Sequence, residues 1–141
     1  MQQFIEFFGN HLVLFAAFGT VLLLMVANEV HGSLTGGKRV GPLEAVRMIN
    51  DREPVIVDLR AAGDFKKGHL LNAINVPLAK LEERSGDLGK DKNRPVLLYC
   101  ALGSTSGEAA ARLRKLGFAE AYPIRGGLNA WMQSNLPVTA K

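Results

Sequence analysis

The sequence predicts an α/β fold: a three-layer domain with a central parallel sheet covered by helices on both faces, preceded by one N-terminal transmembrane helix. From residue 42 onward, short apolar strand-like runs alternate with helix-like segments, which is typical of a parallel sheet. Before them, no Asp, Glu, Lys or Arg lies between Glu6 and Glu29. With 141 residues, the chain has room for one such domain with a real core, and not for two.

The uncharged run, Phe7 to Asn28, is long enough to cross the ~30 Å hydrocarbon core of a bilayer as a helix. A signal peptide would carry a basic start, and the first basic residue here is Lys38. A core helix of a soluble protein is the other alternative, and the run is long for one. The sequence therefore favours a membrane anchor at 1–28 that contacts the lipid bilayer through residues 7–28.

The charges after this run predict how the chain is oriented. All 17 Lys and Arg follow residue 37, so the positive-inside rule places the C-terminal part in the cytoplasm. Residues 29–41 hold four glycines together with Ser and Thr. We therefore expect a flexible Gly-rich linker at 29–39 and the α/β domain at 40–141.

Composition excludes several function classes. The net charge of +4 is modest and no basic run is interleaved with aromatic residues, so no nucleic-acid partner is expected. The single cysteine, Cys100, cannot form an intramolecular disulfide, which fits a reducing compartment. The three histidines are scattered, and no Cys–His set has metal-ligand spacing. No metal and no cofactor are expected.

The first elements of the domain follow from their apolar spacing. A helix is predicted for Pro42 to Asn50, with Pro in the first turn and apolar residues at helical spacing. Val55 to Val57 is wholly apolar, as expected for a strand buried on both faces.

The rest of the domain continues the alternation of strands and helices, and Gly117 sits at the usual glycine cap position of the helix predicted at 106–116. The expected elements are a helical turn at 64–67, a strand at 73–76, a helix at 78–88, a strand at 96–99, a helix at 106–116, a strand at 121–124 and a last helix from Gly126-Gly127 to about Ser134.

The chemistry is expected at Cys100, which directly follows the strand at 96–99. In open parallel sheets, ligands bind beyond the carboxyl ends of the strands. Thr105 and Glu108 match a capping box, so the next helix should begin there. The backbone N–H groups of the intervening loop can then form a nest that lowers the thiol pKa and holds a persulfide or a sulfur oxyanion. We therefore expect Cys100 to be catalytic and the binding loop to consist of Ala101, Leu102, Gly103, Ser104, Thr105 and Ser106.

Two simpler interpretations stay open. A lone Cys after an apolar strand is usually a small buried hydrophobic residue. Ordinary turn chemistry also explains a loop of small residues. Gly103 and the small residues from Ser104 to Gly107 nevertheless suit a backbone cradle better than a packed core.

Four motifs occur in order over residues 38–138. They are Val57-Asp58-Leu59-Arg60, Gly68-His69-Leu70 followed by Ala73-Ile74-Asn75-Val76-Pro77, the loop Cys100 to Ser106 (CALGSTS), and Gly126-Gly127 with Trp131. Together they resemble the rhodanese-like (sulfurtransferase) family, in its single-domain, membrane-anchored bacterial form. The resemblance implies a rhodanese-like three-layer fold and a single-pass protein of the bacterial inner (cytoplasmic) membrane.

The family implies that Cys100 attacks a small sulfane-sulfur donor, becomes a persulfide and passes the outer sulfur to a thiol or other nucleophile. The alternative is a non-catalytic rhodanese-like binding or scaffold module that recruits partners at the membrane, such as a membrane protein. The intact Cys100 favours the enzyme.

Departures from the family pattern adjust this expectation. Many single-domain members carry Arg at the position of Thr105. The two-domain members carry Thr there, as this chain does. Ala101 and Leu102 replace basic residues that suit thiosulfate, so thiosulfate activity is expected to be weak. Related phosphatases carry an Arg where this chain has Ser106, so no side chain clamps a phosphate and phosphatase activity is not expected.

The remaining motif residues are interpreted structurally. Asp58 and Arg60 are either a supporting pair of the site or, more commonly, an ion pair that ties strand ends to loops. His69 is expected to be a hydrogen-bonded structural residue, and Trp131 a core residue.

Overall fold

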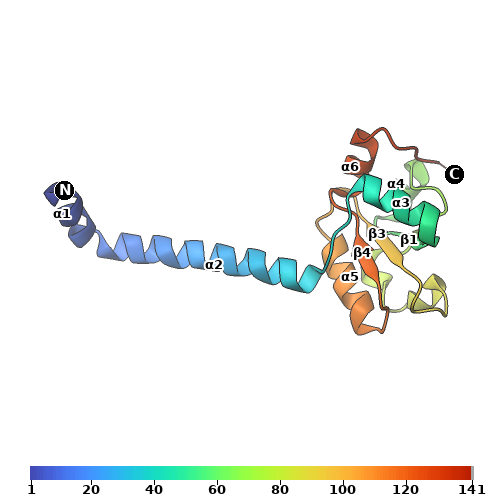
Figure 1. The fold of residues 1–141 in the computed structure, drawn as a ribbon, viewed down its shortest axis with the longest axis horizontal. Helices are drawn as coiled ribbons and strands as arrows, with labels where there is room; N and C mark the ends of the chain where they lie inside the picture. Colours follow the sequence, from blue (N-terminus) through green and yellow to red (C-terminus); the bar gives the residue numbers. More distant parts are fainter. Residues whose placement is uncertain (141) are drawn as a thin grey trace. The chain divides into compact units, whose positions relative to one another are not determined.

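The computed structural model describes residues 1–140, except for the side chains of Phe8 and residues 32–36. It consists of two compact units, Met1–Leu34 and Thr35–Lys141. Figure 1 shows that the first is helical and that the second contains the sheet.

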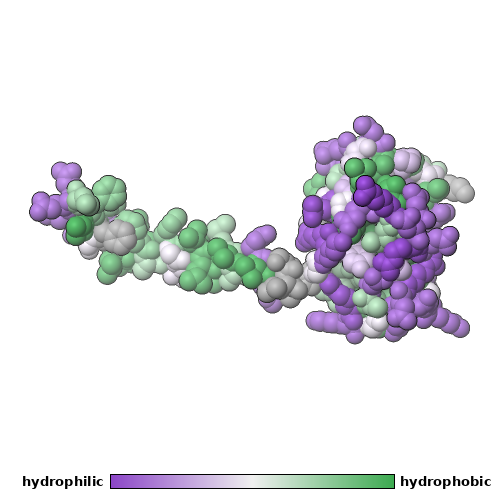
Figure 2. Space-filling view, in the orientation of Figure 1, coloured by the Kyte–Doolittle hydropathy of each residue, from purple (hydrophilic) through white to green (hydrophobic). Residues whose placement is uncertain are grey.

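Two helices, α1 (Gln2–Asn10) and α2 (Leu12–Gly36), form the N-terminal unit. The helix breaks at His11, whose ring contacts Phe7 with the centroids 4.8 Å apart. Because of this break, the apolar span runs from Leu12 to His31, whereas the sequence predicts Phe7 to Asn28. Its side chains are exposed, and Figure 2 shows apolar residues around α2. By length and composition this helix suits a membrane anchor or a signal sequence.

The predicted flexible linker at 29–39 is instead mostly helical, because α2 continues to Gly36. A helix that is already formed gains one hydrogen bond for each added residue, and a glycine costs only about 1 kcal/mol within it. Gly37 then leaves the helix with a φ of +66°, in the left-handed region that glycine adopts readily. Only 37–39 connect the helix to the first paired residue of the domain, Val40.

The domain contains a four-stranded parallel sheet, as predicted, and its strand order is β2-β1-β3-β4. Val40 extends this sheet beyond β4 by a single parallel bridge to Ile124. The strands are β1 (Val55–Asp58), β2 (Ile74–Asn75), β3 (Val96–Tyr99) and β4 (Ala121–Pro123). The helices are α3 (Pro42–Arg52), α4 (Ala62–Lys67), α5 (Ser106–Lys115) and α6 (Gly127–Gln133).

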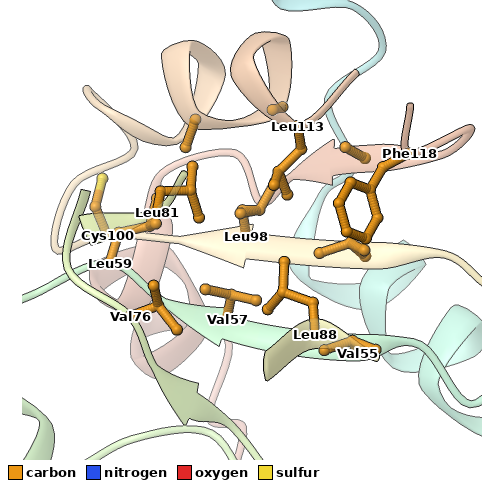
Figure 3. Packing of buried hydrophobic residues seen from close by; sticks show 14 residues of the cluster. Val55, Val57, Leu59, Val76, Leu81, Leu88, Leu98, Cys100, Leu113 and Phe118 are labelled. Atoms are coloured by element: carbon orange, nitrogen blue, oxygen red, sulfur yellow. The ribbon is translucent and has the colours of Figure 1, made fainter. Parts of the chain in front are cut away.

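Alternate residues of the central strands pack into two separate hydrophobic clusters, one on each face of the sheet. Leu98 points to the cluster that includes α5, and Leu97 points to the cluster that includes α3 and α6. Trp131 belongs to the second cluster and donates its Nε1–H to the Pro137 carbonyl at 3.0 Å, which confirms it as a core residue. Figure 3 shows the first cluster between β1, β3 and α5. The three-layer α/β prediction is therefore confirmed.

The predicted helix at 78–88 is wrong. Two short 3-10 helices, η1 (Leu78–Lys80) and η2 (Ser85–Leu88), take its place. The Ser85 hydroxyl donates to the Glu82 carbonyl at 2.9 Å, and such a local bond competes with helical hydrogen bonding. Burial of Leu81 and Leu88 in the same cluster fixes this irregular path by tertiary packing.

Candidate active site

Cys100 lies at the carboxyl end of β3, at the edge of the hydrophobic cluster that contains Leu59 and Leu98 (Figure 3). Only 6% of the residue is exposed. Its sulfur is not surrounded by aliphatic groups alone, because the backbone N–H of Gly103 donates to Sγ at 3.0 Å. A buried thiol that accepts a backbone hydrogen bond is prepared to carry negative charge.

The start of α6 fixes the orientation of the loop that follows Cys100. The N–H of Leu128 donates to the Cys100 carbonyl at 2.9 Å, and the N–H of Asn129 donates to the Ala101 carbonyl at 3.0 Å. With these carbonyls held by α6, loop N–H groups are left to face the sulfur. Main-chain bonds thus preorganise the nest that the sequence predicts.

Close approach between the loop and α6 requires glycine at two positions. Gly103 has a φ of +87°, and a Cβ there would lie 2.9 Å from the backbone nitrogen of Gly126. A Cβ on Gly127, which has a φ of +58°, would collide with the Cys100 carbonyl oxygen. The Gly126-Gly127 motif therefore permits the close approach of α6 to the loop after Cys100, although it lies far from Cys100 in sequence.

The pKa of the Cys100 thiol reflects two opposing effects. Burial raises it, while hydrogen bonds from the Thr105 hydroxyl and from the N–H groups of Thr105, Ser106 and Gly103 lower it. The hydrogen bonds prevail, and the pKa falls from an ordinary value of 9.0 to about 7. Near neutral pH, roughly half of the sulfur is therefore thiolate, which is the nucleophilic form.

The predicted capping box is wrong, although α5 does begin at Ser106. Thr105 makes no side-chain cap, and its hydroxyl instead helps to lower the pKa of the Cys100 thiol. Glu108 accepts from Arg112 at 2.6 Å, one helical turn along. The Thr105 hydroxyl thus affects the pKa of the buried thiol, whereas the motif predicts that it binds a backbone N–H.

A pocket of about 280 Å³ opens at the sulfur, between the carboxyl ends of β1 and β3. Of the predicted loop, Gly103 and Ser106 do not line this pocket, and their backbone N–H groups lower the pKa of the thiol. The lining residues are Leu59, Arg60, Ala61, Asp64, Cys100, Ala101, Leu102, Ser104 and Thr105.

Three residues of the pocket wall, Leu59, Ala61 and Asp64, were not expected from the sequence. They follow β1, whose last residue, Asp58, is paired in register with Tyr99 of β3. The pairing of β1 with β3 could have predicted them, because neighbouring parallel strands have their carboxyl ends side by side.

Asp58 and Arg60 form an ion pair that supports one wall of the pocket. Asp58 is fully buried and accepts from Arg60 Nη2 at 2.7 Å, and the same nitrogen donates to the Gly68 carbonyl at 2.6 Å. Arg60 also lies over the Tyr99 ring, 5.9 Å from its centroid. Burial raises the pKa of Tyr99, whose hydroxyl accepts from the Leu70 N–H at 3.1 Å. This network ties β1, β3 and the loop at residues 68–70 together.

His69 does not line the pocket and makes structural contacts instead. Its Nδ1 lies 2.7 Å from the Phe65 carbonyl, and its ring stacks on Phe65 at 3.7 Å. The structural interpretation of His69 is confirmed.

A larger cavity of about 570 Å³ lies near Pro54 and Arg94, which precede β1 and β3 at the amino ends of these strands. No lining residue of this cavity belongs to the Cys100 loop. The perturbed thiol, and not the cavity volume, therefore marks the candidate site.

The sequence profile of the rhodanese-like domain family matches residues 42–134, which are most of the chain. The chain is 32% identical over 139 residues to the uncharacterized protein YibN of Escherichia coli (strain K12), covering 98% of this chain and 97% of that protein. It is 37% identical over 94 residues to a protein named thiosulfate sulfurtransferase GlpE from Coxiella burnetii (strain RSA 331 / Henzerling II), covering 67% of this chain and 86% of that protein.

Solved structures support the same assignment at the level of the fold. A rhodanese-related protein from Thermoplasma volcanium superposes with a TM-score of 0.67 at 24% identity, over 74% of this chain and 100% of that chain. The profile match, the parallel sheet and the Cys100 loop agree with the resemblance seen in the sequence. The chain therefore belongs to the rhodanese-like domain family.

Proposed function

We propose that this chain is a membrane-anchored sulfurtransferase that moves sulfane sulfur through a Cys100 persulfide to a thiol or another nucleophile. The observation that carries the proposal is the buried Cys100 sulfur, which accepts the Gly103 N–H and has a pKa of about 7. A binding module has no need of a nucleophile that is half ionised at neutral pH. The sulfurtransferase name of the Coxiella burnetii relative supports the same chemistry.

The reaction has two displacement steps. The Cys100 thiolate attacks the outer sulfur of a donor X–S⁻, the sulfur–X bond breaks, and X⁻ leaves with the bonding electron pair. Cys100 then carries an anionic persulfide. A thiolate acceptor attacks the outer sulfur, takes it as R–S–S⁻ and returns Cys100 to the thiolate.

The loop contributes by stabilising charge. In each step negative charge shifts between the inner and outer sulfur atoms. The Gly103 N–H already donates to the inner sulfur, and the N–H groups of Thr105 and Ser106 also lower its pKa, so little reorganisation is needed as the charge moves. No side-chain base is required, since the thiolate is present at neutral pH.

The membrane part of the proposal rests on α2. Its apolar segment Leu12–His31 has no buried face and is long enough to span a bilayer. All 17 Lys and Arg lie on its C-terminal side, which favours a single-pass topology in the bacterial inner membrane with the catalytic domain in the cytoplasm.

Persulfide formation tests the central chemistry. The full-length chain in detergent is treated with a sulfane donor and its intact mass is measured. We expect a gain of about 32 Da, one sulfur atom, that cyanide removes and that Cys100→Ser lacks. No gain with thiosulfate, an organic thiosulfonate or inorganic polysulfide would contradict the proposal and leave a binding module.

The role of the Thr105 hydroxyl is tested by the pH dependence of alkylation at Cys100. In the native chain the rate should have its midpoint at about pH 7 and fall tenfold per pH unit below it, because only the thiolate reacts. Thr105→Val removes one hydrogen bond to a charged sulfur and should raise the midpoint by about one unit. The control, Thr105→Ser, keeps the hydroxyl and should stay near pH 7. Equal midpoints for the Val and Ser variants would show that this hydroxyl does not act on the sulfur.

Membrane anchoring is tested by fractionation and protease protection in the producing bacterium. The native chain should resist alkaline carbonate extraction, because the span has no charged residue before Glu29. Its domain should be protected in intact spheroplasts, because all 17 Lys and Arg lie on the C-terminal side of the span. A variant that lacks residues 2–28 should move to the soluble fraction. A shortened soluble protein, made by cleavage of the native chain, would instead indicate a signal sequence.

A further inference from the structure

The pocket at Cys100 has an apolar wall. Leu59 and Leu102 are its two large apolar side chains, and Ala61 and Ala101 complete the lining between them. Leu59 is buried, whereas Leu102 is 68% exposed at the mouth of the pocket. Because Leu102 lines the pocket together with Leu59, this wall suits contact with an apolar part of a ligand.

The charged side chains that line this pocket do not favour a dianion. Arg60 donates to both oxygens of Asp58, at 3.1 and 2.7 Å, so a buried carboxylate compensates its charge. Asp64 adds a carboxylate to the lining, with Lys67 Nζ 3.7 Å from it. Among the residues that line the pocket, no cation is left to pair with a second negative charge on a donor.

We propose that the sulfur donor at this site is a singly charged organic sulfane-sulfur compound, a thiosulfonate or persulfide whose apolar substituent packs against Leu102 and Leu59. This inference rests on the proposed function and names its substrate class. The pocket of about 280 Å³ is large enough for one such substituent, since a cavity of roughly 150 Å³ can hold a benzene ring. Leu102 is then a specificity-determining residue.

The transfer step balances for a thiosulfonate. The Cys100 thiolate attacks the terminal sulfur of R–SO2–S⁻, and the bond between that sulfur and the sulfonyl sulfur breaks. The electron pair leaves with the sulfinate R–SO2⁻, and Cys100–S–S⁻ remains. Cyanide then takes the outer sulfur as thiocyanate, which restores the thiolate and gives a measurable product.

The experiment compares benzenethiosulfonate with thiosulfate as donors for the full-length chain in detergent, with cyanide as the acceptor. We expect kcat/KM for benzenethiosulfonate to exceed that for thiosulfate by about tenfold or more, as one apolar group in a pocket discriminates by roughly 10–200-fold. The order of the two donors, and not the absolute rate, is the result that matters.

Three variants separate size from charge. Leu102→Lys adds a cation at the mouth and should raise kcat/KM for thiosulfate by about fivefold while lowering it for benzenethiosulfonate by a similar factor. Leu102→Ala should lower only the benzenethiosulfonate value. The matched control is Leu71→Lys, which adds the same charge at a leucine that is 66% exposed and does not line the pocket. Both of its values should equal those of the native chain.

The outcomes distinguish this inference from the proposed function. If the persulfide forms but thiosulfate is used as well as benzenethiosulfonate, or Leu102 variants leave the ratio unchanged, the substrate class is wrong and the sulfurtransferase stands. If neither donor gives thiocyanate and no donor gives a persulfide, the proposed function fails and this inference fails with it.

Discussion

The hydrogen bonds that reach the Cys100 sulfur depend on a second set of bonds behind them. Leu128 and Asn129 at the start of α6 hold the carbonyls of Cys100 and Ala101, which leaves N–H groups of the loop to face the sulfur. Glycine at 103 and 127 permits this close approach. The domain therefore brings α6 against the end of β3 so that main-chain donors stabilise a buried negative charge.

The same arrangement bears on whether Cys100 is a core residue or a nucleophile, and it favours the nucleophile. Cys100 belongs to the hydrophobic cluster, and burial alone would raise its pKa and leave it inert. The Thr105 hydroxyl and the loop N–H groups outweigh burial and bring the pKa to about 7. Asp58 and Arg60 contribute from one side, where their buried pair ties the end of β1 to the loop at Gly68.

Sequence patterns predict the elements whose cause is local. The strand at 96–99 matches the structure residue for residue, because four buried apolar residues in a row have few alternatives. The helix at 78–88 does not form, since burial of Leu81 and Leu88 against distant residues decides that path. The Thr105–Glu108 motif could not reveal that the hydroxyl lowers the thiol pKa, and Asp64 joins the pocket through the pairing of β1 with β3.

The central claim is that backbone N–H groups stabilise the Cys100 thiolate. It is tested most directly by following the amide resonances of Gly103, Thr105 and Ser106 as pH is raised, in the full-length chain and in Cys100→Ser. These amides should shift with a common midpoint at about pH 7 in the native chain and stay unchanged in Cys100→Ser. Amides that do not respond, or a midpoint near the ordinary thiol value of 9.0, would contradict the account.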